Sequence, residues 1–236
     1  AVEVLIGHNE CNVIIETNVG IKRIDIVNIL ERITGSNKIK LNLKIVPQDE
    51  KLAKNQSERI KCGDNGIFKG VPLNNLEKQI SKLARKLYDN IPYDGKYVLT
   101  EDHLIVCQSN ATNEKIQNII NEVMDTTNLK IIINPLGEWE GGTNVDTGAT
   151  NRKLGSDMAQ SVTGGGIHGK DLSKADVSIN IYAFKKAQET GKEVELFCAI
   201  GDDMIDGKPY NEIVDEAREY INNIGGFEKF AEWGLY

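Results

Sequence analysis

Residues 135–172 interrupt the patterned part of the chain, and this stretch limits most strongly how the sequence can fold. It is rich in glycine, threonine and asparagine, and it lacks the apolar spacing of a helix or a strand. A loop of this length inside a compact protein is usually functional or disordered. The segments on either side must therefore supply the core, and the stretch itself is the first place to look for a ligand site.

Those flanking segments read as strands and helices in mixed order. Residues 48–62 are polar and unpatterned, so we expect a loop there. Thr112 is an expected N-cap for the helix that follows it, and Gly191 an expected helix end. The pattern predicts an α+β protein with a hint of repeated modules. The expected strands are 1–6, 12–17, 41–46, 129–134, 192–200 and a hairpin over 96–108, and the expected helices are 24–33, 73–89, 113–125, 173–189 and 211–224.

Composition excludes several classes of protein. The chain has 236 residues and a net charge of -7, which argues against general nucleic-acid binding. No apolar run is long enough for a membrane span, and no signal or transit peptide is visible. The four cysteines lack C-x-x-C spacing, so we interpret them as reduced core residues. These features predict a cytoplasmic protein that binds neither nucleic acid nor membrane.

The segment TGGGIHGKDLSKAD, residues 163–176, combines three consecutive glycines, which expose the backbone, with closely spaced charged side chains. It fails as a P-loop, because Asp171 follows Lys170 where that motif needs Ser or Thr for Mg²⁺. Glycine still allows close approach to an anion, lysines neutralise it, and Asp176 offers an oxygen to a divalent cation. The segment is therefore either a polyphosphate–Mg²⁺ site or a surface turn with solvated charges.

Five ordered motifs resemble the S-adenosylmethionine synthetases (methionine adenosyltransferases). GGGIHGKDLSKAD at 164–176 is similar to the family's phosphate loop, G-G-G-A-F-S-G-K-D-x-x-K-x-D. INPLGEWEGGTNVDTGATNRK at 133–153 resembles I-N-P-x-G-R-F followed by G-G-P-x-G-D-x-G-L-T-G-R-K. KCGDNGIFKG at 61–70 resembles A-G-D-Q-G-L-M-F-G, and PYDGKYVLT at 92–100 resembles R-P-D-x-K-x-Q-V-T. Glu3 and Glu16 keep the thirteen-residue spacing of the family's A-x-E-T and G-G-E-I motifs.

The resemblance implies a transferase of S-adenosylmethionine biosynthesis and one-carbon metabolism. Methionine sulfur would attack C5′ of ATP, and the expelled triphosphate would be cleaved with water to phosphate and pyrophosphate. The chemical difficulty is a highly charged leaving group, which preorganised cations and backbone N–H groups stabilise. The family also implies three similar modules with pseudo-threefold symmetry, and a homodimer or larger assembly whose active site lies between subunits that pack flat sheets face to face.

The resemblance also assigns roles to individual residues. Catalytic roles fall on Lys96, Arg152, Lys153 and Lys170. The ATP side takes Asp94, Lys96, Trp139, Asp146, Arg152, Lys153, Gly164, Gly165, Gly166 and Lys170, and Trp139 stands where the family has the phenylalanine that stacks on adenine. Methionine would be held by Glu16, Asp64, Asp146 and Lys174. Mg²⁺ would bind Asp176, and K⁺ would belong to the region of Glu3.

Two features depart from the family pattern. The N-terminal G-H-P-D-K motif, which supplies a phosphate contact and a Mg²⁺ ligand, is absent from residues 1–236, and GHNEC at 7–11 is only a superficial echo. We expect that the motif precedes the sequence given; otherwise half of the metal site is missing. The family's long mobile loop is reduced to residues 48–61, so we expect a compact member.

We expect an N-terminal module at 1–63, a central module at 64–135 and a C-terminal module with the phosphate loop at 136–236. Two alternatives to the synthetase remain. One is a non-catalytic nucleotide-binding paralogue that acts as partner or regulator of a synthetase. The other is an enzyme that acts on triphosphate or a nucleotide alone.

Overall fold

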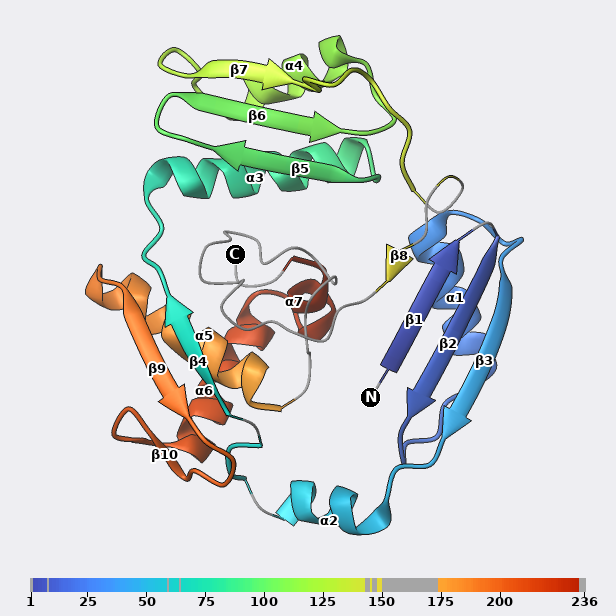
Figure 1. The fold of residues 1–236 in the computed structure, drawn as a ribbon, viewed down its shortest axis with the longest axis vertical. Coiled ribbons are helices and arrows are strands. Elements are labelled where there is room, and N and C mark those ends of the chain that lie inside the picture. The colour runs from blue at the N-terminus through green and yellow to red at the C-terminus, as the bar shows by residue number, and fades with distance from the viewer. Residues whose placement is uncertain are drawn as a thin grey trace.

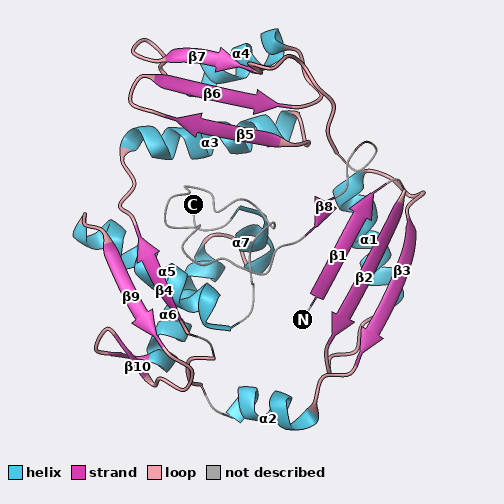
Figure 2. Cartoon of the chain, in the orientation of Figure 1, coloured by secondary structure: helices cyan, strands magenta, loops and turns pink. Residues whose placement is uncertain are grey.

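The computed structural model describes seven stretches of the chain. They form a mixed α+β fold of helices and small sheets (Figure 1; by element type in Figure 2). This agrees with the α+β prediction, whereas the pseudo-threefold arrangement stays a prediction. The described residues are 2–7, 9–58, 60–63, 65–142, 145, 148–149 and 174–233.

The first sheet has the strand order β3-β2-β1-β8. Strands β1 (Val2–Gly7) and β2 (Glu10–Glu16) form an antiparallel hairpin, and β3 (Lys40–Val46) runs parallel to β2. Helix α1 (Arg23–Thr34) makes the crossover between β2 and β3. The core between this helix and the sheet consists of Cys11, Val13, Ile15, Leu30 and Leu41. Buried and exposed residues alternate along β2, and no described helix covers the opposite face of the sheet.

The second sheet has the order β5-β6-β7 and is covered by two helices. Strands β5 (Gly95–Leu99) and β6 (His103–Gln108) form the predicted hairpin, and β7 (Lys130–Ile133) is parallel to β6. Helix α3 (Asn75–Asn90) begins with a capping box, and α4 (Asn113–Val123) is capped by Thr112 as expected. The core joins both helices to β6 and includes Leu83, Leu87, Leu104, Val106, Ile116 and Ile120.

The third sheet pairs two strands that are far apart in sequence. Strand β4 (Gly66–Gly70) is antiparallel to β9 (Val194–Cys198). Helix α5 (Lys174–Thr190) packs on this sheet and on α6 (Tyr210–Asn223). The remaining elements are the small hairpin β10 (Met204–Ile205) and β11 (Lys208–Pro209), and α7 (Phe227–Trp233), which buries Phe230.

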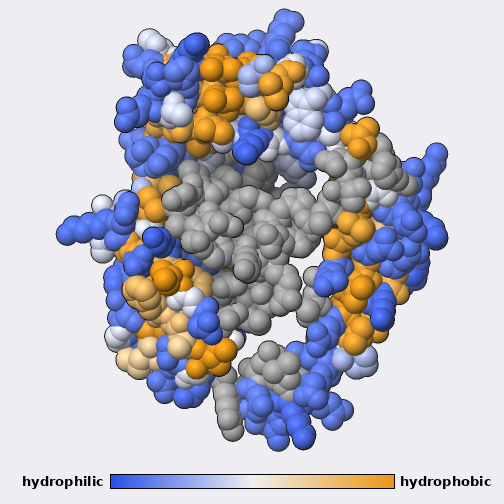
Figure 3. Space-filling model, in the orientation of Figure 1, coloured by the Kyte–Doolittle hydropathy of each residue, from blue (hydrophilic) through white to orange (hydrophobic). Residues whose placement is uncertain are grey.

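The helices α1, α3, α4 and α5 lie behind the three larger sheets in Figure 1, so the helix-free face of each sheet is turned to the viewer. In the same orientation, hydrophobic surface gathers over all three sheets (Figure 3). The side chains of Leu5, Ile14, Ile67, Val98 and Phe197 are between 41% and 63% exposed. Large apolar areas of this kind mark interaction sites more often than ordinary surface.

The expectation of a loop over 48–62 is wrong, because α2 (Glu50–Glu58) occupies much of it. Its residues are mostly good helix formers, and Lys54 and Glu58 form an i,i+4 ion pair at 3.8 Å. Local propensity therefore makes a helix here without a strong apolar stripe. Strands β4, β10 and β11 and helix α7 were not predicted either.

Two strand pairings cross the expected module boundaries. Strand β4 lies in the expected central module but pairs with β9 of the expected C-terminal module. Strand β8 (Gly148–Ala149) adds to the sheet of the expected N-terminal module through pairs with Leu5 and Ile6. The division at residues 63 and 135 stays a prediction. Among the helices that the structure describes, none is long and apolar enough to cross a bilayer.

Candidate functional site

The structure describes the side chains of five predicted site residues: Glu3, Glu16, Asp94, Lys96 and Trp139. Lys174 and Asp176 lie in the first turn of α5, where the helix is described but these two side chains are not. The other predicted residues lie outside the described part of the chain: Asp64, Asp146, Arg152, Lys153, Gly164, Gly165, Gly166 and Lys170. Their roles stay predictions from the sequence.

Asp94 meets the glycine pair that follows Trp139. Its Oδ2 atom accepts a hydrogen bond from the backbone N–H of Gly142 at 3.1 Å. A Cβ atom on Gly141 would lie 2.5 Å from the same oxygen, and Gly142 has φ +100°, where other residues are strained. The two glycines therefore let the backbone approach this carboxylate closely.

The end of β6 holds the backbone of Asp94 in place. Its carbonyl oxygen accepts from the N–H of Ser109 at 2.9 Å, from the Ser109 hydroxyl at 3.1 Å and from Gln108 Nε2 at 3.1 Å. Gln108 and Ser109 are fully buried. The Tyr97 hydroxyl donates to Gln108 Oε1 at 2.7 Å, and burial raises the pKa of Tyr97 to about 12. Asp94 is thus an exposed carboxylate on a rigid, buried support.

Trp139 is fixed through its backbone. Its carbonyl oxygen accepts from the N–H of Asn110 at 3.0 Å, and the Oδ1 atom of Asn110 accepts from the N–H of Gly141 at 2.8 Å. The Trp139 side chain is 41% exposed. An aromatic ring that is held by its main chain and partly open to solvent can offer a face to a planar ligand.

The segment before Trp139 is bonded to the same strand end. Asn134 has φ 41°, accepts from the N–H of Gln108 at 2.9 Å and donates through Nδ2 to the Gln108 carbonyl at 3.2 Å. Glu138 Oε1 accepts from the N–H of Asn113, in the first turn of α4, at 2.9 Å. Carboxylates are favoured at helix N-termini, so this bond adds to the anchoring of the turn.

Lys96 lies two residues beyond Asp94 on β5. It is exposed, and it stands opposite Cys107 in the antiparallel register. Tyr97 and Leu99 pack against the core beneath the helices. Because successive side chains of a strand point to opposite faces, Lys96 lies on the helix-free face. The structure therefore brings Asp94, Lys96 and Trp139 to one end of the β5-β6-β7 sheet.

Glu3 and Glu16 belong to a different sheet but share one face of it. Glu3 pairs with Ile14 across the hairpin, and Glu16 lies two residues further along β2. All three side chains are exposed, so the two glutamates are diagonal neighbours on the helix-free face. The thirteen-residue spacing thus has a geometric consequence: both carboxylates face the same way.

Strand β8 follows the Trp139 turn in the chain and pairs with β1, in the sheet that carries Glu3 and Glu16. The chain leaves Asp94 at Gly142 and reaches β1 at Gly148, which pairs with Ile6. Figure 1 shows β8 beside β1, at the edge of the first sheet. Gly142 and Gly148 thus lie near the two groups of candidate residues, and Asp146, between them in the sequence, lies outside the described residues.

The residues around Asp64 are anchored to the turn after β9. The N–H of Cys62 donates to the Asp202 carbonyl at 2.9 Å, and the N–H of Gly201 donates to the Cys62 carbonyl at 2.8 Å. Burial, with a hydrogen bond to Cys62, raises the pKa of Cys198 to about 12. A buried thiol with a raised pKa is unreactive. Cys11, Cys62 and Cys198 are buried as predicted, whereas Cys107 is only partly buried and is not a core residue.

The described side chains form no cluster of acidic, histidine or cysteine ligands that could hold a metal ion. Within the described part of the chain, no group of three or more His, Cys, Asp or Glu side chains comes together. Glu3 alone cannot meet the oxygen requirement of a hard cation. The side chain of Asp176, the Mg²⁺ ligand predicted from the sequence, lies outside the described part of the structure.

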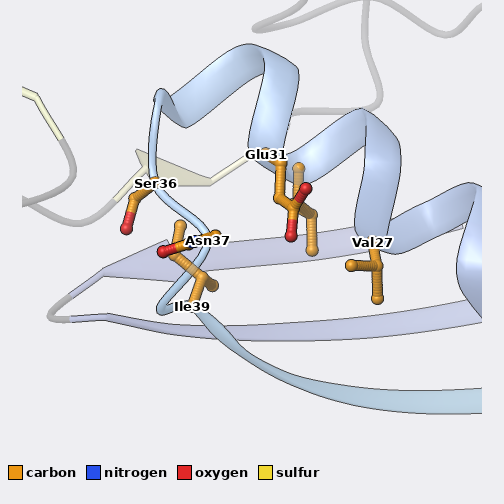
Figure 4. A pocket seen from close by; sticks show the side chains of 6 residues that line it. Val27, Glu31, Ser36, Asn37 and Ile39 are labelled. Carbon is orange, nitrogen blue, oxygen red and sulfur yellow. The ribbon is translucent and has the colours of Figure 1, made fainter.

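A small hollow lies between α1 and the turn that leads to β3 (Figure 4). Glu31 of α1 and Asn37 of the turn point into it, beside apolar side chains such as Val27 and Ile39. None of the predicted site residues lines it. We assign it no role in the candidate site.

Sequence reasoning missed Gln108, Ser109, Asn110 and Asn134, which hold the candidate residues together. The available signal was the run of polar residues CQSNATN directly after an apolar strand. Polar side chains at a strand end can hydrogen-bond neighbouring loops, but the sequence does not say which loops approach.

The described fold is similar to that of a solved S-adenosylmethionine synthetase. The chain resembles a solved structure described as an unusual S-adenosylmethionine synthetase from Campylobacter jejuni. The TM-score is 0.58 at 18% sequence identity, and the match covers 87% of this chain and 70% of that one. No protein-family model matches the chain, and no curated protein sequence does. The likeness therefore concerns the fold.

Proposed function

We propose that this protein is a methionine adenosyltransferase, which converts ATP, L-methionine and water to S-adenosylmethionine, phosphate and pyrophosphate. The observation that carries the proposal is the agreement between a sequence motif and a fold. A chain with the spacing of the synthetase phosphate loop at 164–176 also has the fold of a synthetase structure.

The described site suits the nucleoside end of ATP. The partly exposed Trp139 ring offers a stacking surface, and stacking is not specific to phenylalanine. Asp94 directly precedes the neighbouring strand β5, and Lys96 is the second residue of that strand. On the triphosphate side, the proposed contacts are Arg152, Lys153, Lys170 and the three glycines 164–166. Glu16, Asp64, Asp146 and Lys174 are the proposed methionine contacts.

Sulfur is already a good nucleophile, so the proposed reaction needs no activated serine, cysteine or histidine. The protein's task is to align sulfur with C5′ and to stabilise the triphosphate as it leaves. Mg²⁺, with Asp176 as its proposed ligand, would screen the phosphate charges when bound. K⁺ is proposed for the region of Glu3.

We further propose a homodimer or larger assembly with the active site between subunits. The helix-free faces of three sheets lie on one side of the molecule and carry exposed Leu5, Ile14, Ile67, Val98 and Phe197. A second copy of this chain presents the same flat apolar face, so a two-fold axis can cover both. Three similar modules, with a pseudo-threefold axis between them, are part of the same proposal.

The experiment is an incubation of the protein with ATP, methionine, Mg²⁺ and K⁺. Products are identified by mass and by phosphate release. S-adenosylmethionine that forms only with methionine present supports the proposal. Bound ATP without product favours a non-catalytic paralogue, and phosphate released without methionine favours a triphosphate- or nucleotide-hydrolysing enzyme.

A further inference from the structure

We propose that Asn110 is a positioning residue that sets the affinity of the Trp139 side of the site for a nucleotide base. The inference rests on the proposed function only for the class of ligand. Its structural part stands on three consecutive residues, Gln108, Ser109 and Asn110, at the end of β6.

These three residues hold two loops that are distant in sequence. Gln108 and Ser109 donate to the carbonyl of Asp94, as three hydrogen bonds between 2.9 and 3.1 Å. Asn110 makes two bonds to the other loop, one to the Trp139 carbonyl at 3.0 Å and one from the Gly141 N–H at 2.8 Å. The strand end is therefore the common support of both loops.

One more hydrogen bond joins the two loops directly. The N–H of Gly142 donates to Asp94 Oδ2 at 3.1 Å, so the turn 139–142 is held at both ends. The bonds use only main-chain groups of the turn. The indole of Trp139 is consequently left 41% exposed, while its backbone cannot rotate freely.

Asparagine suits this position for two physical reasons. Asn110 has φ 58°, the left-handed region that asparagine tolerates better than most residues. Its short amide also places an acceptor beside the Gly141 N–H. Glycine would keep the backbone conformation but lose the acceptor, whereas aspartate would keep both. The side chain is exposed, so its removal does not open the core.

The test uses Asn110→Gly, with Asn110→Asp as the conservative variant. Asn9→Gly is the matched control, because Asn9 is an exposed asparagine with φ 64° in the β1–β2 turn. All are made with Trp233→Phe, which leaves Trp139 as the single tryptophan. Trp139 fluorescence is then titrated with MgATP and, separately, with inorganic tripolyphosphate, and acrylamide quenching is measured without ligand.

We expect Asn110→Gly to weaken MgATP binding about fivefold, which is the effect of one neutral hydrogen bond. Acrylamide quenching should increase, and the affinity for tripolyphosphate should not change. Asn110→Asp should recover most of the MgATP affinity. A merely structural role would instead lower the affinity for both ligands together with the melting temperature.

The inference is overturned if Asn110→Gly binds MgATP like Asn9→Gly, or if the unmodified site does not bind MgATP. The proposed function fails in a different way. MgATP binding that depends on Asn110, without formation of S-adenosylmethionine, would support this inference and contradict the synthetase activity.

Discussion

The carboxylate of Asp94 accepts a hydrogen bond from the backbone N–H of Gly142, 3.1 Å away and 48 residues later in the chain. This contact joins the loop before β5 to the turn that carries Trp139. Both loops belong to motifs that resemble synthetase motifs in the sequence. The fold therefore brings the two motifs together at one end of the β5-β6-β7 sheet, where we propose the nucleotide site.

The contact gives a prediction for Gly142→Ala. The residue has φ +100°, and a Cβ atom would lie 3.0 Å from the Tyr93 ring. Backbone strain of this kind costs about 1–3 kcal/mol, and the crowded ring adds to it. Gly137→Ala is the matched control, because Gly137 has φ +101° with no atom near its Cβ position. Urea unfolding should show a larger loss for Gly142→Ala, and equal losses would contradict the packing at Tyr93.

A second glycine tests how the third sheet packs. A Cβ atom on Gly70 would overlap the backbone carbonyl of Ala183 in α5. Backbone cannot move aside as a side chain does, so Gly70→Ala should lose about 1–3 kcal/mol of unfolding free energy. Gly20→Ala, where no atom lies within 4 Å, should be close to neutral. A stable Gly70→Ala would show that α5 does not lie directly on β4.

Tyr97 predicts a loss of stability at alkaline pH. Burial raises the pKa of Tyr97 to about 12 in the folded protein, while the unfolded chain titrates near 10. The unfolded state therefore releases the proton first, and the unfolding free energy falls between about pH 10 and 12 by on the order of 1 kcal/mol per pH unit.

Tyr97→Phe should be less stable at neutral pH, because Gln108 Oε1 loses its donor, by about 1–3 kcal/mol. It should also show a shallower decline above pH 10. Chemical unfolding at several pH values measures both effects. Parallel pH profiles for the two proteins would contradict the burial of this phenol.

The proposed dimer predicts different outcomes for two exposed apolar residues. Phe197 is 63% exposed on the helix-free face of β9, and Ile24 is 58% exposed on α1. Phe197→Glu should lower the molecular mass measured by sedimentation, because it places a charge in the proposed interface. Ile24→Glu should leave the mass unchanged. A wild-type monomer, or dissociation by both variants, would argue against pairing through the sheet faces.

Much of the fold was predictable where the apolar period was clear. The stripe Leu76, Ile80, Leu83, Leu87 predicted α3, and the polar turn at Glu101 and Asp102 predicted the hairpin β5–β6. Helix α2 was not predicted, because its residues favour a helix individually but do not form a clear apolar face. Strand β4 was missed because its partner β9 comes more than a hundred residues later, and pairing over such a distance has no local signal.

The candidate site, like the fold, was predictable only in part. Resemblance to known motifs indicated Asp94, Lys96 and Trp139, which the structure places at one sheet end. The support residues Gln108 and Asn110 could not be identified in advance. Their role depends on which carbonyl and amide groups lie within hydrogen-bonding distance, and the sequence does not encode that distance directly.

The most direct measurement of the central claim is S-adenosylmethionine formation by three proteins assayed together: the wild type, Lys170→Ala and Lys192→Ala. Lys170 is the proposed phosphate ligand, whereas Lys192 is an exposed lysine between α5 and β9. With ATP, methionine, Mg²⁺ and K⁺, we predict methionine-dependent product from the wild type and Lys192→Ala, and at least a hundredfold less from Lys170→Ala, of the order expected for removing one preorganised charge. Equal product from Lys170→Ala, or none from the wild type, would contradict the account.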